Sequence, residues 1–279
     1  ASRMAARKRC SPTPTPAPLT FDLEGFRQFS ILKDQFDGLL EYTGDRNYSV
    51  ISSSFSPDGS AFALSACWGS LWNTGACESQ SSGFLVVVNA NTGEVISDIP
   101  VDNSWPGKTA FSPDGKQLYV STTYHKVFAW DLTTNSLSTT FLEQPYDGRT
   151  RYPDVAVAPD GSTVAAVVNK ILYVWDSTGQ LRFQKPAFQG TFRAGLNFSG
   201  DGQLLTIFSE GLTGVDVLQV TDGSLVHQLP MESVGGASIS PDGRFLAAFN
   251  YENDTVKVWN LVTAEEVTEI TADTMISSL

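Results

Sequence analysis

Long hydrophobic runs are missing from this chain of 279 residues. The most apolar run, at residues 84–88, is far shorter than the roughly 20 residues that a membrane-spanning helix needs. Charged residues make up 17% of the chain and hydrophobic residues 41%, a balance that excludes a disordered protein and can supply one large core. We therefore expect a folded protein without a direct membrane span.

Basic residues are scarce outside the first twenty positions. The chain has 18 basic and 30 acidic residues, for a net charge of −12. Arg3, Arg7, Lys8 and Arg9 all precede residue 21, and no acidic residue accompanies them. The remainder is strongly acidic and would repel phosphate backbones and anionic lipid surfaces. We therefore expect no nucleic-acid partner.

Cysteine and histidine are also too few for several kinds of site. Three cysteines, Cys10, Cys67 and Cys77, cannot build a disulfide framework. Cys67 and Cys77 form either a local disulfide in an oxidising compartment or two ordinary thiols in a reducing one. With His125 and His227 as its two histidines, the chain cannot supply a multi-histidine metal site or the usual haem and copper ligands.

Motifs that carry catalysis are lacking as well. The sequence contains no glycine-rich phosphate loop, no Gly-x-Ser-x-Gly, no Cys-x-x-Cys and no His-x-x-x-His. We therefore predict no catalytic residue, no cofactor and no metal site, and a protein that is not an enzyme.

A turn of the Ser-Pro-Asp-Gly type recurs five times along the chain. The copies lie at residues 55–59, 111–115, 157–161, 198–202 and 239–243. Proline presets the backbone of such a turn and glycine takes its positive φ, so each copy predicts a tight hairpin between two strands. The recurring aspartates are assigned to turn chemistry rather than to catalysis. They are Asp58, Asp114, Asp160, Asp201 and Asp242.

A second pattern follows each turn and completes the repeat. In four of the five repeats an apolar strand follows, and its last residue lies 16–18 residues after the turn aspartate; in the first repeat it comes about fourteen residues late. These strands lie at residues 85–89, 127–131, 172–176, 215–219 and 256–260. Another turn and a short fourth strand come next. Four strands in about 40–45 residues make one blade of a β-propeller.

The repeats resemble those of the WD-repeat β-propellers over roughly residues 47–271. The Trp-Asp dipeptide of that family is matched at Trp130 and Trp175, and nearly so at Trp259. The first and fourth repeats depart from it, with Val88 and Leu218 in place of tryptophan. The Gly-His dipeptide of the family is absent, so its buried Asp–His–Ser/Thr–Trp tetrad cannot form. Residues 118–121 are also similar to secreted Tyr-Val-Thr-Asn propellers.

The predicted fold is all-β, a β-propeller with five recognisable four-stranded blades. The blades are expected at about 47–100, 106–143, 152–187, 192–230 and 233–271. Residues 21–46 contain apolar runs that predict either a divergent partial blade or a strand that closes the ring. A small five-bladed ring and a chain that was once longer are the alternatives. An unclosed propeller would expose two strand edges.

Residues 1–20 are expected to lie outside the fold. They are basic, and residues 11–18 form a proline-rich spacer. The segment is interpreted either as a disordered tail or as the remnant of a targeting sequence. Together with Cys67 and Cys77, it favours an organelle after removal of a transit peptide, the periplasm or the exterior over the cytoplasm.

Alternation of strand direction separates the connections into two groups. The tight turns emerge on one side of each blade, and the connections from the second to the third strand and between blades emerge on the other. Aromatic and arginine side chains, which commonly anchor protein interfaces, recur in the second group. The candidate interface residues are Trp68, Trp72, Trp105, Tyr124, His125, Tyr146, Arg149, Arg151, Tyr152, Arg193 and Tyr251. For each of them, folding back over the core is the alternative. Trp130, Trp175 and Trp259 are assigned to the core.

The resemblance implies a scaffold or accessory subunit that binds other protein subunits. One alternative is a propeller-type hydrolase or lactonase whose channel holds a cation through residues such as Asp102, Asn103 and Asp154. Another is a secreted ligand-recognition propeller, with a Cys67–Cys77 bridge and a sugar on a glycosylation motif. Such motifs begin at Asn47, Asn197 and Asn253.

Overall fold

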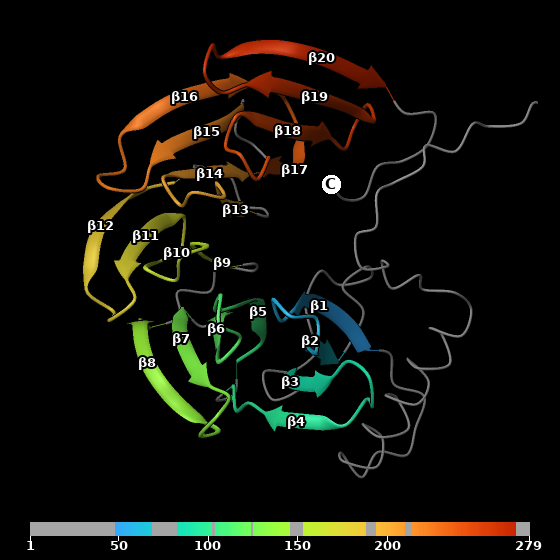
Figure 1. The fold of residues 1–279 in the computed structure, drawn as a ribbon, viewed down its shortest axis with the longest axis vertical. Coiled ribbons are helices and arrows are strands. Elements are labelled where there is room, and N and C mark those ends of the chain that lie inside the picture. The colour runs from blue at the N-terminus through green and yellow to red at the C-terminus, as the bar shows by residue number, and fades with distance from the viewer. Residues whose placement is uncertain are drawn as a thin grey trace, which may run out of the picture. The chain divides into compact units, whose positions relative to one another are not determined.

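The computed structural model describes residues 48–68, 83–101, 104–123, 125–145, 153–187, 194–209 and 214–271. The chain divides into two compact units, Ala1–Asp45 and Arg46–Leu279, and every described residue belongs to the second. All regular structure within the described residues is β-strand, arranged in five four-stranded sheets (Figure 1).

Each sheet consists of four strands that follow one another in the chain and pair antiparallel. Blade 1 contains β1 (Tyr48–Phe55), β2 (Ala61–Trp68), β3 (Gly83–Asn89) and β4 (Val95–Asp98). Blade 2 contains β5 (Pro106–Phe111), β6 (Gln117–Thr122), β7 (Lys126–Asp131) and β8 (Ser136–Glu143). Blade 3 contains β9 (Asp154–Val157), β10 (Thr163–Val168), β11 (Ile171–Asp176) and β12 (Leu181–Pro186). Blade 4 contains β13 (Ala194–Phe198), β14 (Leu204–Ser209), β15 (Gly214–Gln219) and β16 (Leu225–Pro230). Blade 5 contains β17 (Val234–Ile239), β18 (Phe245–Asn250), β19 (Thr255–Asn260) and β20 (Glu265–Thr271). The prediction of five four-stranded blades is confirmed.

The tight turns are built by the residues that repeat in the sequence. In the first, Ser56 Oγ donates to Asp58 Oδ1 at 2.7 Å, and the same oxygen accepts from the Ser60 amide at 3.0 Å. Gly59 has φ 71°, a conformation that glycine adopts without steric cost. The turns at Asp114, Asp201 and Asp242 form the same hydroxyl-to-carboxylate bond at 2.6 Å. The third turn replaces that serine with alanine, and Asp160 accepts from the Ser162 amide at 2.9 Å. The aspartates therefore act in turns, as predicted.

Successive blades pack through opposite faces of their third strands. In blade 2, Val127 and Ala129 belong to a cluster with Trp175 of blade 3, whereas Trp130 belongs to a cluster with Leu85 of blade 1. We call the face toward the next blade in the chain the trailing face, and the face toward the preceding blade the leading face. The three repeat tryptophans are buried in leading faces, with relative exposures of 9% for Trp130 and 2% for both Trp175 and Trp259. They are core residues.

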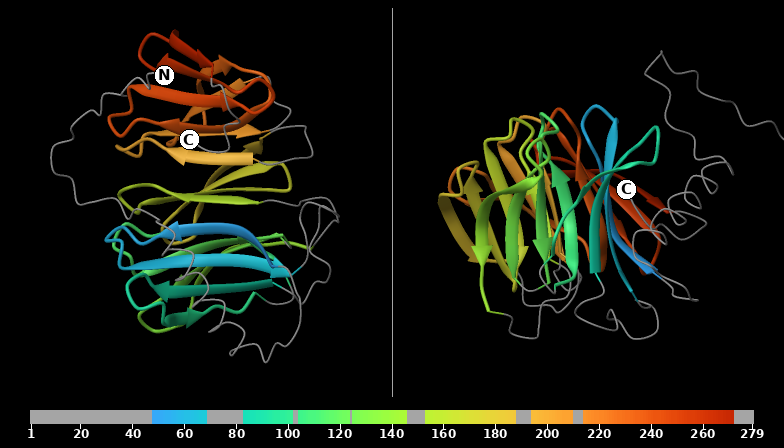
Figure 2. Two further views of the ribbon diagram at one scale, coloured as in Figure 1. Left: turned by 90° about the vertical axis from the view of Figure 1, so that its right-hand side faces the viewer. Right: turned by 90° about the horizontal axis from the view of Figure 1, so that it is seen from below.

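The first strands of the blades contact one another in chain order. β1 packs against β5, β5 against β9, β9 against β13, and β13 against β17. Figure 2 shows the five sheets from two further sides. Within the described residues, blade 5 and blade 1 share no packing interface of comparable extent.

Candidate functional site

The side opposite the tight turns, which we call the loop side, is irregular from blade to blade. β10 and β11 are joined there by Asn169 and Lys170 alone, with φ 49° and 64°, whereas residues 69–82 separate β2 from β3. The connections on this side therefore differ widely in length. The loop side combines one two-residue turn with longer connections, of which residues 69–82 are the longest between a second and a third strand.

The eleven candidate interface residues differ in burial, and the structure describes only some of them. Trp105 is half-buried, His125 is buried and Tyr251 is exposed. Trp68 ends β2, and only its backbone is described, as is true of Cys67. The other candidates and the second cysteine lie outside the described residues. They are Trp72, Cys77, Tyr124, Tyr146, Arg149, Arg151, Tyr152 and Arg193.

His125 does not belong to an exposed surface. Its relative exposure is 0%, and its Nδ1 lies 3.2 Å from the carbonyl oxygen of Pro145. It closes the connection of three residues between β6 and β7, where its backbone turns left-handed with φ 60°. Because so short a connection stays close to the strand ends, the imidazole lies against the segment that follows β8 and contains Pro145. The short distance in sequence between the two strands was the signal that could have predicted the burial of His125.

Tyr251 lies at the turn between β18 and β19 and is 42% exposed. The residue before it, Asn250, is held rigidly. Its Oδ1 accepts from the amides of Glu252 and Asn253 at 2.7 and 3.1 Å, and its Nδ2 donates to the Glu232 carbonyl at 2.8 Å. Tyr251 is therefore an exposed aromatic side chain on a turn that hydrogen bonds fix in place.

A groove of about 680 Å³ opens beside this turn, between the outer part of blade 4 and the leading face of blade 5. It is lined by Gln228, Pro230, Met231, Glu232, Asn250, Asn253, Thr255, Lys257 and Glu269. Lys257 Nζ lies 2.9 Å from Glu266 and 3.2 Å from Glu269. Hydrogen bonds to these two carboxylates raise the pKa of Lys257. The groove therefore has a neutralised cation in one wall and amide and carboxylate groups around it.

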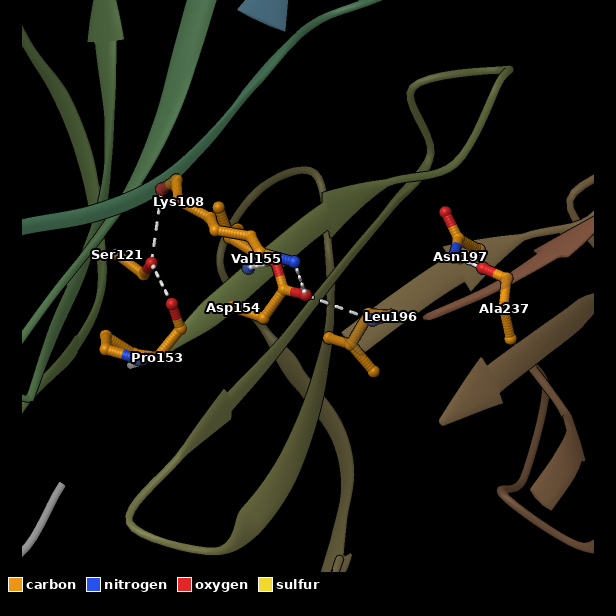
Figure 3. A network of polar contacts seen from close by, with 8 residues as sticks. All are labelled: Lys108, Ser121, Pro153, Asp154, Val155, Leu196, Asn197 and Ala237. Atoms are coloured by element: carbon orange, nitrogen blue, oxygen red, sulfur yellow. Dashed lines mark hydrogen bonds and ion pairs between the residues drawn. The ribbon is translucent and has the colours of Figure 1, made fainter. Parts of the chain in front are cut away.

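Asp154, the candidate cation ligand, is buried, and its carboxylate is engaged by three hydrogen-bond donors of the protein (Figure 3). Its carboxylate accepts from Lys108 Nζ at 2.8 Å, from the Leu196 amide at 3.1 Å and from the Val155 amide at 2.8 Å. Burial raises the pKa of Asp154, and the Lys108 ammonium opposes that rise. These contacts join the first strands of blades 2, 3 and 4. Asp154 therefore links blades, and its carboxylate is not arranged to hold a cation.

The other residues of the candidate cation site give no evidence for a bound cation. Asp102 and Asn103 lie outside the described residues. Among the residues that are described, no group of three histidine, cysteine, aspartate or glutamate side chains could hold a metal ion.

Two further polar links join blades at the same level (Figure 3). Ser121 Oγ lies 3.1 Å from the Lys108 carbonyl and 3.0 Å from the Pro153 carbonyl, to which it donates. Asn197 Nδ2 donates to the Ala237 carbonyl at 2.6 Å. Asn197, the start of one glycosylation motif, is therefore engaged in a strand. Nothing in the sequence pattern distinguishes these side chains from the many other serines and asparagines.

Within the described part of the chain, no helix has the length and apolar character required to cross a membrane.

One repeat is recognised by a family model. The family described as "WD40: WD domain, G-beta repeat" matches residues 223–260. These residues cover β16 of blade 4 and β17, β18 and β19 of blade 5, so the sequence repeat starts one strand before the structural blade. The match and the fold agree.

The chain folds as a β-propeller, and one of its repeats resembles the WD40 repeat.

Solved structures support the fold of the propeller. Among 1613 matching chains, the crystal structure of the computationally designed Ika8 protein superposes with a TM-score of 0.64 at 14% identity. The match covers 82% of this chain and 64% of the designed one, so this chain spans less than two thirds of the designed protein. At this identity the likeness shows the fold alone. A comparison with curated proteins gives no match. WD40 propellers are generally non-enzymatic and typically bind other proteins.

Proposed function

We propose that this propeller is a non-enzymatic interaction platform, a scaffold or accessory subunit of a larger protein assembly, and that partners bind its loop side. The observation that carries the proposal is the exposed Tyr251 on a fixed turn beside the groove between blades 4 and 5. Tyrosine on a rigid support is a frequent anchor of protein interfaces, because it contributes a large contact area at little entropic cost.

The turn side offers less to a partner. Its aspartates are engaged with neighbouring hydroxyl and amide groups, as at Asp58 and Asp114. These bonds lower the pKa of each carboxyl, so the side chains are held in their turns as carboxylates. The loop side differs between blades and therefore provides specific features for recognition.

The charge of the chain favours a basic partner. The net charge is −12, and the groove is bordered by Glu232 and Glu269 while Lys257 is neutralised within it. Long-range attraction would steer a segment rich in lysine or arginine toward this surface. The candidate interface residues whose side chains lie outside the description, led by Trp68 and Trp72, are proposed to extend this surface.

The first test is the native size of the protein in gently lysed source material. Sizing chromatography with mass spectrometry of the co-eluting fractions should place the protein far above 30.2 kDa, together with a reproducible set of other chains. Elution without any other chain would contradict the role as a subunit.

The second test assigns the surface. Tyr251→Ala should weaken retention of the co-eluting chains about tenfold, the effect of losing roughly 1.4 kcal/mol of binding free energy. A double variant, Trp68→Ala with Trp72→Ala, tests the insertion in blade 1. Leu137→Ala is the matched control, because Leu137 is 49% exposed next to a tight turn. Equal loss in the control and in Tyr251→Ala would contradict a specific loop-side surface.

A further inference from the structure

Charge is distributed unevenly among the blades. Residues 194–271, which contain blades 4 and 5, have eleven acidic and two basic side chains. Residues 104–187, which contain blades 2 and 3, have seven acidic and eight basic ones. The excess negative charge therefore belongs to the part of the chain that forms the groove. A local field of this kind attracts cationic groups and repels anionic ones.

Exposed carboxylates border the groove from three different elements. Glu232 lies in the connection between β16 and β17, Glu252 on the turn between β18 and β19, and Glu269 on β20. Glu232 and Glu269 line the groove itself, and Glu252 is the neighbour of Tyr251 in the chain. A cationic side chain that enters the groove would therefore meet carboxylates from more than one element.

The other groups in the groove suit a polypeptide. Gln228 and Asn253 contribute exposed carboxamides, which hydrogen-bond readily with a peptide backbone. Pro230 and Met231 contribute apolar surface. In the described ranges of the chain, no three histidine, cysteine, aspartate or glutamate side chains form a group that could hold a metal ion. The mixture of carboxylate, amide and apolar groups thus fits an extended basic segment better than a metal ion.

One cation of the chain itself already lies in this groove. Lys257 Nζ is 2.9 Å from Glu266 and 3.2 Å from Glu269, and Glu269 is its direct partner across β19 and β20. One ammonium thus balances two carboxylates, which leaves an excess of negative charge. The side chain of Glu269 keeps a relative exposure of 45%, so a partner can still reach its carboxylate.

We propose that the groove binds an extended segment of a partner whose lysine or arginine side chains pair with Glu232 and Glu269. Lys257 sets the strength of this binding, because it competes from within the chain for the carboxylate of Glu269. The inference rests on the proposed loop-side interface and names the chemistry of its partner. It differs from a general attraction between charges, because removal of the basic group at residue 257 strengthens binding more than removal of a basic group elsewhere.

The test uses the purified full chain and a labelled nine-residue peptide of alternating lysine and serine. Fluorescence anisotropy at physiological ionic strength measures the dissociation constant. Glu269→Gln should weaken binding about threefold, the effect of one exposed ion pair. Glu94→Gln is the matched control, because Glu94 is an exposed glutamate of blade 1, and it should leave binding unchanged. Equal weakening by the two substitutions, or no binding to the wild-type chain, would overturn the proposal.

Lys257→Met tests the internal cation, because it removes the charge and keeps a long side chain. It should tighten binding about threefold, which the loss of a merely structural contact would not do, and Lys257→Arg should bind as the wild type does. Arg244→Met is the matched control. Arg244 is the other basic residue of residues 194–271, and it is exposed beside a tight turn.

The two substitutions to methionine change the net charge of the chain equally. Equal tightening by both would therefore show attraction to the chain as a whole and contradict a specific groove. A peptide of alternating glutamate and serine should not bind, and its binding would contradict the stated partner chemistry.

Hydrogen exchange of the wild-type chain locates the peptide without any variant. Saturating peptide should slow exchange in residues 228–232 and 250–257 and leave residues 61–68 unchanged, and protection confined to other segments would overturn the proposal. These measurements need no native partner. A chain that elutes alone from source material but binds the peptide as described contradicts the subunit role and leaves this inference standing. A chain that elutes with partners but does not bind the peptide does the reverse.

Discussion

At one position of the second strand, the first two blades have a small polar side chain, whereas the last two have an aromatic ring. Six positions after the turn glycine, blades 1 and 2 have Ser65 and Ser121, whose hydroxyls donate to backbone carbonyls of the next blade at 2.9 and 3.0 Å. Blades 4 and 5 have Phe208 and Phe249 at that position, and both are buried. Blade 3 has Val167, paired with the buried Asp154.

The strand opposite each of these side chains explains the difference. Phe208 pairs with Gly195, and a Cβ on that glycine would lie 1.9 Å from the ring. In blade 5, Phe249 covers Gly236, where a Cβ would lie 2.5 Å from the ring. A large side chain on one strand thus requires a glycine on its partner, whereas serine uses the space for a hydrogen bond. The inner packing of the propeller is therefore decided pair by pair and not by the repeat.

The largest expected effect comes from removing an aromatic ring between two blades. Phe208→Ala should lower the free energy of unfolding by about 3–5 kcal/mol, because it leaves a cavity above Gly195. Phe249→Ala should cost clearly less, since no described blade packs on its face. Urea unfolding of both variants at the lowest practical protein concentration measures the difference. Equal losses would show that the trailing face of blade 5 is as well covered as that of blade 4.

A smaller effect is expected from removing the serine hydroxyl that links two blades. Ser121→Ala should lower the free energy of unfolding by about 1–3 kcal/mol, because the buried carbonyl of Pro153 loses the hydroxyl that donates to it. Ser138, an exposed serine in β8, is the matched control, and Ser138→Ala should change stability by less than about 0.5 kcal/mol. Identical urea midpoints for the two variants would contradict a role for Ser121 in joining blades.

The smallest effect concerns the turns, which all blades share. Hydrogen bonds from the Ser56 hydroxyl and then from the Ser60 amide and hydroxyl lower the pKa of Asp58 from 3.8 to about 2. The unfolded chain therefore binds this proton more readily, so the stability that Asp58 contributes above pH 3.8 is lost as the pH falls toward 2. The thermal midpoint of Asp58→Asn should differ from that of the wild type above pH 4 and approach it near pH 2.

Ser56→Ala is the control for the cause of that pKa shift. Without the largest of its hydrogen bonds, Asp58 should titrate closer to 3.8, and the loss of stability should begin at a higher pH than in the wild type. An unchanged pH profile would show that the serine hydroxyl does not hold the pKa of Asp58 down.

Much of the fold could be predicted because its signals are local. Each Asp-Gly turn is built by bonds between residues within five positions of one another, such as Ser56 to Asp58 and Ala61 to Ser56. The recurring turns mark where each hairpin begins and ends, so the order of the strands followed from the repeat. The roles of Trp130, Trp175 and Trp259 followed for the same reason.

The candidate site was predictable only in part, because burial depends on residues far apart in the chain. Tyr251 is exposed as expected, but His125 is buried against Pro145, twenty positions away. Asp154 is engaged by Lys108 and Leu196, which lie 46 and 42 positions away. No local pattern marks such contacts. The placement of Trp72 and Tyr146, outside the described residues, stays a prediction.

The sequence by itself determined the five recognisable blades, with their four strands and the aspartates that shape their turns, since hydrogen bonds over a few residues specify these turns. Only the tertiary structure decided how the blades meet. Which carboxylate lies between three blades depends on contacts between residues more than forty positions apart, as between Asp154 and both Lys108 and Leu196. Such contacts exist only once the neighbouring blades are in place.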